Sequence, residues 1–496
     1  MTLRHKTLLT TGAAALALLL AGIAQGATPP ATEEGEALAR TPRELARLLG
    51  VSEDDVRPDS QRSFSLFGAP VTLGGEMEAS SQADEGFDLD ADEADRRVRA
   101  LPEFKLEARI MPSERMAAFV QAKAYLESDL LDQGGTRSHD SGLRLDQAWL
   151  MFPDLLGTGL GLQVGRQKFQ DRREWWWDED MEAVRVHFGN SRTSGFIAMA
   201  ERLWSGDASA PLAPDERHVR HLMATVSKQV GDRRELDFFV LHSQDRSGAP
   251  AAGQRFNEDA VDEDDARLTW LGARYRGRHK LPSLGKLYLM LDMAVVDGRE
   301  DSTDFVDAGN DELISGATSR QNVRGWAVDG WASWELPIDL EPYLTFGYAY
   351  GSATSPGSTT GEGDFRQTGL HGNNGKYRGI SRFRFYGEAL RPDLVNLQVA
   401  TAALGVPLGP YAWVEAVYHR YRQVQARDSL PGSRLDVDPT GESRNLGSEF
   451  DLVVSFEYQR RWEAELSIGA FRAGPAFGDA TGSWARAASF KLNYNF

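Results

Sequence analysis

The 496-residue sequence contains no cysteine, so neither a disulfide framework nor a thiolate metal site can form. Histidine is scarce, with nine residues, and the chain has neither a Gly-x-Ser-x-Gly elbow nor a His-Glu-x-x-His helix. An enzyme would need a nucleophile with a positioned base, or paired carboxylates in a cleft, and no such arrangement stands out. The sequence therefore predicts no catalytic residues, no metal and no cofactor.

Basic residues are also fewer than acidic residues. The chain has 55 lysines and arginines against 73 aspartates and glutamates, which gives a formal net charge of −18. A protein that binds duplex nucleic acid must neutralise phosphates with basic side chains. Nucleic acid is therefore not an expected partner.

Long apolar runs are missing after the N-terminus. No later window reaches the roughly 18 consecutive apolar residues that a membrane helix requires. At the N-terminus, basic residues precede an apolar stretch from Leu8 to Ala24 and small residues near Gly26, which predicts a cleaved secretory signal over residues 1–26. A single membrane helix is disfavoured because the apolar stretch is short and no basic cluster follows it.

The rest of the chain alternates apolar and polar residues at period two, which is the signal of β-strands. In residues 105–110, Leu106, Ala108 and Ile110 share one face and charged residues share the other. After a short turn, residues 120–126 repeat the alternation, which predicts a hairpin. The pattern alone leaves open a soluble sandwich or a membrane barrel, because an apolar face can meet either a second sheet or lipid.

The lengths of the connections favour the barrel, because bacterial outer-membrane barrels have short periplasmic turns and long extracellular loops. Short turns are expected near residues 111–115, 153–158, 189–194, 230–233, 279–284, 336–341, 406–410 and 460–462. Long polar segments are expected near 80–101, 128–141, 169–180, 205–217, 245–265, 297–321, 353–393, 424–446 and 473–483.

The last strand ends on Phe496 with an aromatic outward face, as outer-membrane proteins require for assembly and closure. We therefore predict an all-β fold, a transmembrane antiparallel β-barrel of about eighteen strands over residues 66–496. The count could change by two, since residues 383–390 read either as a strand or as part of the longest loop. Residues 27–65 are predicted to be a periplasmic N-terminal segment with a short helix near 41–50.

Two other motifs are ambiguous. Residues 175–177 are consecutive tryptophans, and Trp176 is a candidate sugar-stacking residue, although an aromatic belt at the membrane interface explains the motif equally well. The acidic stretches 84–95 and 258–265 suggest surface calcium sites, yet Glu93 and Arg99 break the EF-hand pattern. A solvated acidic loop is the favoured interpretation.

Cationic residues at inward positions could line a channel. Alternation places Arg109, Lys123, Arg144 and Arg185 on the lumenal face, together with acids such as Asp146. In a narrow pore of low dielectric these cations would concentrate an anionic solute. Ordinary ion pairing that fills the lumen would produce the same pattern, and periodicity cannot distinguish the two.

Several stretches resemble the alginate export porins of pseudomonads, outer-membrane channels that secrete the polyuronate alginate. They occur in the same order over most of the mature chain: residues 165–168 continuing to Trp176, Asp178, Glu182 and Ala183, then 268–272, 347–349, 351–352, 367–370, 387–389, 396–398, 417–419, 451–454 and 469–471. The resemblance implies an eighteen-stranded barrel that is constricted by long loops and lined by arginines.

Residue by residue, the resemblance is mixed. Arg166 and Arg382 match family arginines, Arg202 has a similar context, and Arg384 completes the predicted pore set. By alternation Arg166 would face outward, so we expect either a bulge at Gly165 or a position above the lipid. Four positions depart from family arginines and put the identity of the polymer in doubt: Asp146, Tyr350, Glu465 and Ser467.

These observations predict an outer-membrane porin that exports an anionic exopolysaccharide, with alginate expected, through an arginine-lined pore. A general anion-selective porin for small acids or oligosaccharides is the first alternative, and an outer-membrane hydrolase or lyase is the second. Expected partners are the polymer, outer-membrane lipid and lipopolysaccharide, and periplasmic polysaccharide-handling proteins. The chain is expected to be a monomer.

Overall fold

The computed structural model describes residues 61–496 except 91–94, 114, 134–136, 191, 208–209, 249, 258–260, 263, 310–311 and 355–362. The predicted signal at 1–26, the predicted helix near 41–50 and residues 27–60 of the predicted N-terminal segment lie outside the described residues. Within the described ranges, no helix is both long enough and apolar enough to cross a membrane.

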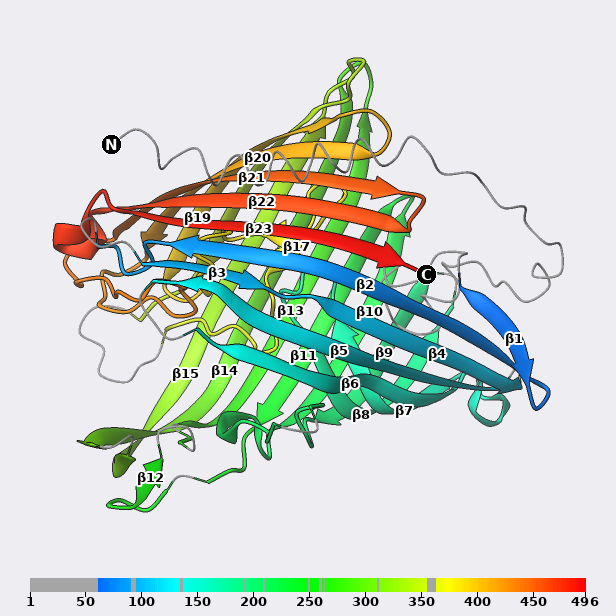
Figure 1. The fold of residues 1–496 in the computed structure, drawn as a ribbon, viewed down its shortest axis with the longest axis horizontal. Coiled ribbons are helices and arrows are strands. Elements are labelled where there is room, and N and C mark those ends of the chain that lie inside the picture. Colours follow the sequence, from blue (N-terminus) through cyan, green and yellow to red (C-terminus); the bar gives the residue numbers. More distant parts are fainter. Residues whose placement is uncertain are drawn as a thin grey trace.

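Eighteen antiparallel strands form a closed barrel, because β2 pairs with β4 on one side and with β23 on the other. The strands are β2 Ala69–Glu85, β4 Glu103–Ser113, β5 Met116–Asp132, β6 His139–Phe152, β7 Gly161–Gln170, β8 Asp178–Gly189, β9 Thr193–Glu201, β10 Arg220–Gly231, β11 Arg234–Gln244, β13 Asp264–Leu281, β14 Gly285–Gly309, β15 Glu312–Glu335, β16 Tyr343–Gly351, β19 Leu397–Pro407, β20 Ala412–Gln423, β21 Asn445–Tyr458, β22 Trp462–Ala473 and β23 Trp484–Asn495. Figure 1 shows the barrel from the side, with β2 and β20–β23 in front. Closure satisfies the backbone groups that an open edge would expose to lipid, and it confirms the predicted fold and strand number.

The remaining short strands extend or cap the barrel. β1 Arg62–Leu66 crosses the predicted boundary at residue 66 and pairs with the start of β2, beside the backbone pairing of Gly75 with Phe496. β3 Arg96–Ala100 continues β4 between β2 and β5, and β12 Arg255–Asn257 pairs with β15. β17 Asn374–Gly375 and β18 Phe383–Arg384 form a small hairpin within the longest loop, so residues 383–390 are not a wall strand.

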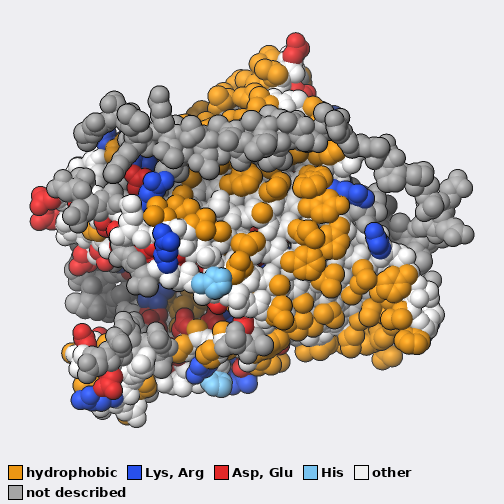
Figure 2. Space-filling view, in the orientation of Figure 1, with side chains coloured by type: hydrophobic (Ala, Val, Ile, Leu, Met, Phe, Trp, Pro, Cys, Tyr) orange, Lys and Arg blue, Asp and Glu red, His pale blue; other side chains and the backbone are white. Residues whose placement is uncertain are grey.

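The outer face of the wall is apolar, as a lipid-facing surface must be. Large apolar side chains such as Leu271, Val295 and Phe450 are about half exposed on it. Figure 2 shows hydrophobic side chains gathered over the wall, while most charged side chains in this view lie toward the end with the long loops. Aromatic pairs mark both borders: Trp462 with Tyr494 at the short-turn end and Trp326 with Tyr350 at the long-loop end.

All the predicted short turns coincide with turns between wall strands. One predicted loop is wrong, however, because residues 297–321 are mostly strand: β14 and β15 stay paired out to Gly309 and Glu312. This part of the hairpin extends beyond the apolar belt, so its outer face has no lipid to meet, and the residues buried on it, such as Glu300, Thr303 and Ser315, are polar. The hydrophobic alternation that reveals a half-buried strand is therefore missing from its sequence.

The hydrophobic core lies inside the barrel. The loop at residues 171–177 and the described part of the loop at 352–396 fold inward and bury aromatic side chains against the inner wall. These are chiefly Trp175, Trp176, Trp177, Phe365, Tyr377, Phe383, Phe385 and Tyr386. The two inward loops therefore narrow the lumen, and we call them the first and second constriction loops.

Candidate functional site: the lumenal constriction

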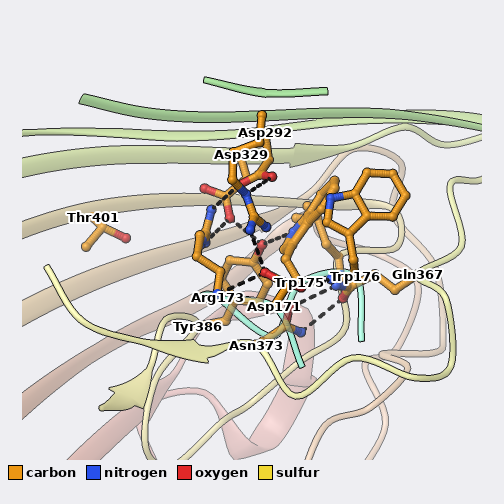
Figure 3. A network of polar contacts seen from close by, with 12 residues as sticks. Asp171, Arg173, Trp175, Trp176, Asp292, Asp329, Gln367, Asn373, Tyr386 and Thr401 are labelled. Atoms are coloured by element: carbon orange, nitrogen blue, oxygen red, sulfur yellow. Dashed lines mark hydrogen bonds and ion pairs between the residues drawn. The ribbon is translucent and has the colours of Figure 1, made fainter. Parts of the chain in front are cut away.

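A buried ionic cluster attaches the first constriction loop to the wall strands β13, β14 and β15 (Figure 3). Arg173 contacts Asp329 at 2.5 Å and Asp292 at 3.3 Å. Arg274 on β13 contacts Asp171 and Asp292, each at 2.6 Å. We call these five residues the anchor cluster. Because Asp292 contacts both arginines, the loop and the wall form one charge network.

The anchor cluster also reaches the second constriction loop. The Tyr386 hydroxyl donates to Asp329 at 2.6 Å, and the Trp175 indole donates to the Tyr386 hydroxyl at 3.0 Å. Burial lowers the pKa of Arg173, but Asp329 and Asp292 outweigh that effect and raise the pKa above its ordinary value. Arg173 therefore stays charged and holds both loops against the wall.

The opposite side of the second constriction loop rests on β21. The carboxylate of Glu449 accepts the backbone N–H groups of Ala389 at 2.6 Å and Leu390 at 3.1 Å. Gly387 has φ +96°, and a Cβ there would lie 2.5 Å from a Glu449 oxygen, so only glycine permits this approach. The loop is consequently fixed to the wall on two sides of the barrel.

The inner wall on β4 and β5 carries pairs of opposite charge that are partly exposed. Lys123, a predicted pore residue, lies 3.0 Å from Glu103, and Lys105 lies 3.4 Å from Glu76. The Lys123 and Lys105 side chains are 16% and 24% exposed, respectively. We call these four residues the wall pairs.

Four other predicted pore residues also contact carboxylates. Arg144 lies 3.1 Å from Asp146, and Arg382 lies 2.5 Å from Glu174 on the first constriction loop. Arg166 contacts Glu182 at 2.8 Å, and Arg202 contacts Glu179 and Glu216. Ion pairing, the alternative that the sequence left open, therefore describes most of the predicted set.

Arg166 is buried under the loop that follows β9, so it is exposed neither to the lumen nor to lipid. The β7–β8 register continues through Gly165 without a shift, so the expected bulge is absent, although Gly165 has φ +124°. The Arg166 guanidinium is buried beneath Trp204, 5.3 Å from its ring, and donates to the backbone carbonyls of Asp146 and Trp204. Arg166 therefore joins the loop after β9 to the wall.

The remaining three predicted cations have no carboxylate contact within the described residues. Arg185 is buried and stacks on Phe169 at 3.8 Å and Phe196 at 4.8 Å. Arg384 donates to the Gly372 carbonyl at 2.5 Å, and Arg109 is partly buried on β4. Of the predicted set, Arg109 and Arg384 therefore have no carboxylate partner among the described residues, whereas Lys123, Arg144, Arg202 and Arg382 are partly exposed but paired.

Trp176 has no exposed surface, and its ring stacks on Phe239 with the centroids 4.8 Å apart. Its backbone N–H donates to Asp171 at 2.7 Å. In this arrangement Trp176 packs the first constriction loop. A sugar-stacking role stays a prediction and would require the ring to be uncovered.

Sequence reasoning named only two cations of the second constriction loop, Arg382 and Arg384, and missed the others. Between residues 365 and 392 the chain has one acid, Glu388, and six lysines and arginines: Arg366, Lys376, Arg378, Arg382, Arg384 and Arg391. A local charge count would have found this segment, since the whole chain is strongly acidic. The anchor cluster had no such signal, because its members come from four separate parts of the sequence.

Glu174 is the titratable group between the two constriction loops. Its carboxylate accepts from Arg382 and from Gln170, and its backbone carbonyl accepts the N–H groups of Gly372 and Asn373. Burial and the nearby Asp178 carboxylate raise the pKa of Glu174 to about 7, against the opposing effect of Arg382. The charge at this contact therefore changes near neutral pH. Among the described residues no cluster of side chains has the composition of a metal site.

Comparison with known proteins gives consistent matches. A family model described as "Alginate export" matches residues 69–490. The alginate production protein AlgE of Pseudomonas aeruginosa is 26% identical over 398 residues, which cover 74% of this chain and 79% of that protein. Its counterpart from Pseudomonas syringae pv. tomato is 25% identical over 315 residues, which cover 59% of this chain and 60% of that protein.

Solved structures with a similar fold are more distant in sequence. OccAB1 of Acinetobacter baumannii has a TM-score of 0.51 at 11% identity, and the match covers 88% of this chain and 99% of that one. The outer-membrane protein opdK of Pseudomonas aeruginosa has a TM-score of 0.50 at 9% identity, with coverage of 86% and 98%. At such low identity the likeness concerns the fold alone.

Proposed function

The chain belongs to the alginate export family, and on this basis we propose that it is a passive channel through which alginate leaves the periplasm. The closed barrel and its apolar outer face place the protein in the outer membrane. The family match over nearly the whole described barrel is the observation that carries the proposal. Transport through a channel requires no covalent step.

We propose that the second constriction loop supplies the cations that face the polymer. The wall cations are largely neutralised by wall carboxylates, whereas residues 365–392 of this loop hold six lysines and arginines and one acid. Arg378 and Arg382 have side chains 31% and 21% exposed, respectively. In this proposal the loop cations offset the absence of cations at Glu465 and Ser467, where the resemblance implied arginines on the wall.

Weak binding at several sites suits conduction better than one tight site, because a tightly bound polymer would stall. The arrangement of the loop cations supports this. Arg382 already contacts Glu174, Arg378 contacts Glu335 at 3.3 Å, and Arg384 contacts a carbonyl oxygen. A uronate carboxylate would therefore exchange with an existing partner rather than meet a bare cation, which limits the net gain at each step.

The proposal is tested in a planar bilayer under a salt gradient. We expect a reversal potential of an anion-selective pore and a current that falls when polymannuronate is added to one side. A neutral dextran of equal length is the matched control and should block much less. Cation selectivity without polymer block would contradict the proposal.

The same experiment separates the alternatives. A general anion-selective porin would conduct small acids and show no length-dependent block by polyuronate. A hydrolase or lyase would release shortened products from the polymer, which chromatography would detect. We further propose that the channel works as a monomer and receives the polymer from periplasmic polysaccharide-handling proteins.

A further inference from the structure

A pocket of about 230 Å³ opens on the outer side of the wall, at the long-loop end of β20, β21 and β22. Arg420, Ser448 and Arg472 line it and occupy directly opposed positions on these three strands. Asn445 and Thr481 add an amide and a hydroxyl group. No lining residue carries a carboxylate, so the pocket is a cationic and polar site in an acidic protein.

The pocket lies outside the lumen. Arg420 and Arg472 are exposed, whereas their chain neighbours His419 and Phe471 are fully buried on the inner face. Successive strand residues point to opposite faces of a sheet. The two arginines therefore point away from the proposed polymer path, and transport of a polymer through the barrel does not explain them.

The position along the wall indicates the interface between lipid headgroups and acyl chains. Two residues further into the membrane, the same outward rows carry Tyr418 and Phe450, which are 43% and 51% exposed. Trp484 on β23 is paired with Arg472, and the centroid of its ring lies 5.9 Å from the guanidinium carbon of Arg472. A ligand in the pocket would thus have cations around its head and apolar side chains beneath it.

The charge balance of the pocket is unusual for this protein. Arg422 is exposed and lies opposite Asn445, so a third guanidinium borders the pocket. In the described part of the chain, Arg420, Arg422 and Arg472 make no ion pair with a carboxylate. By contrast Arg486, the next arginine on this face, lies 3.2 Å from Glu85. Like charges at adjacent positions repel each other, so an anion in the pocket would stabilise the cluster.

We propose that this pocket binds the phosphate of a phosphorylated glycolipid in the outer leaflet, that is, the lipid A part of lipopolysaccharide. Guanidinium groups bind phosphate oxygens in a bidentate manner, and the pocket has room for a headgroup phosphate but not for a whole lipid. The acyl chains would lie along Tyr418 and Phe450. The long-loop end faces the outer leaflet, which is where this lipid resides.

The test uses the full-length purified protein and native mass spectrometry with bisphosphorylated lipid A. The double variant Arg420→Ala with Arg472→Ala is expected to weaken binding about 25-fold, since each arginine near an anionic headgroup contributes about a factor of five. Dephosphorylated lipid A should bind the unmodified protein about as weakly. The variant Arg420→Lys with Arg472→Lys should keep part of the affinity, because charge remains while the planar fork is lost.

A matched control removes an equal charge elsewhere on the same face. Arg267 and Arg299 are exposed and directly opposed on β13 and β14, just beyond Leu271 and Val295, and they do not line the pocket. Arg267→Ala with Arg299→Ala should leave lipid A binding almost unchanged. Equal losses in the two double variants would overturn the proposal, as would equal binding of phosphorylated and dephosphorylated lipid A.

Two further measurements keep the outcome clear. Bilayer conductance and heat-dependent gel mobility should be unchanged in Arg420→Ala with Arg472→Ala, which establishes that the barrel is folded. If oligomannuronate binds through these arginines and lipid A does not, the pocket is a uronate site and the lipid proposal is wrong. The result is independent of polymer transport, because conductance and polymer block are measured separately.

Discussion

The anchor cluster and the wall pairs use the same chemistry in different surroundings. In the anchor cluster, the Arg173 and Arg274 side chains are 2% exposed and Asp292 is fully buried. In the wall pairs, Lys105 and Lys123 retain access to the lumen. Both sets place cations opposite carboxylates inside one barrel, so the difference between them is burial.

That difference suggests different roles. Attraction between opposite charges grows as the surroundings become less polar, and removing one partner of a buried pair leaves an uncompensated charge. An exposed pair is worth little, because water and salt screen both partners. The anchor cluster is therefore suited to holding the constriction loops, and the wall pairs are suited to exchanging partners with a passing anion.

The largest effect is expected for Arg173→Ala. Removing this side chain leaves Asp292 and Asp329 buried with one cation fewer, at a cost of about 3–5 kcal/mol. We expect the first constriction loop to leave the wall and single-channel conductance to rise. Lys123→Ala is the control, since loss of a partly exposed pair at the lumen is expected to cost about 1 kcal/mol or less. If Arg173→Ala and Lys123→Ala lowered the free energy of urea unfolding in lipid vesicles equally, burial would not distinguish the anchor cluster from the wall pairs.

A smaller effect is expected when cations of the second constriction loop are removed. Arg382→Ala with Arg384→Ala should weaken polymannuronate block about fivefold, the factor that corresponds to about 1 kcal/mol. Arg324→Ala is a suitable control, because Arg324 is 77% exposed on the outer face at the long-loop end. Unchanged block in the loop variant would mean that these arginines do not face the polymer.

Protonation of Glu174 should change selectivity without any mutation. Its pKa is raised to about 7, so the carboxyl is ionised at pH 8 and neutral at pH 6. At pH 6 Arg382 loses its counter-charge, and anion selectivity should therefore increase as the pH falls. In Glu174→Gln this pH dependence should disappear between pH 6 and 8. A reversal potential that shifts equally in both proteins would exclude Glu174 as the responsible group.

The sequence predicted the barrel well, because the physics of a membrane wall is periodic. Alternation over residues 105–110 and 120–126 follows from lipid on one face and lumen on the other. The strand that ends near Phe496 closes the barrel by pairing with β2, which leaves no edge exposed to lipid. The same rule failed at residues 297–321. There β14 and β15 extend into water, and their sequence has no apolar face to reveal them.

The constriction was harder to predict, because its contacts join distant parts of the chain. Arg173 meets Asp329, which is 156 residues away, and no local pattern connects them. Trp176 was a candidate sugar-stacking residue because aromatic rings pack against carbohydrate faces, yet its loop folds inward and buries it. Inward alternation identified Lys123 and Arg144 as lumenal, but it could not show that acids neutralise them.

The smallest expected effect concerns the Lys123 and Glu103 pair, and it tests whether wall charges cancel. Lys123→Ala should lower anion selectivity slightly and Glu103→Ala should raise it, while the double variant should return close to the unmodified protein. The coupling energy for stability should be about 1 kcal/mol or less, because both side chains remain partly exposed. Reversal potentials of the four proteins measure the first effect, and unfolding in lipid vesicles measures the second. A coupling as large as the cost expected for Arg173→Ala would mean that the wall pairs are structural and that burial does not separate the two sets.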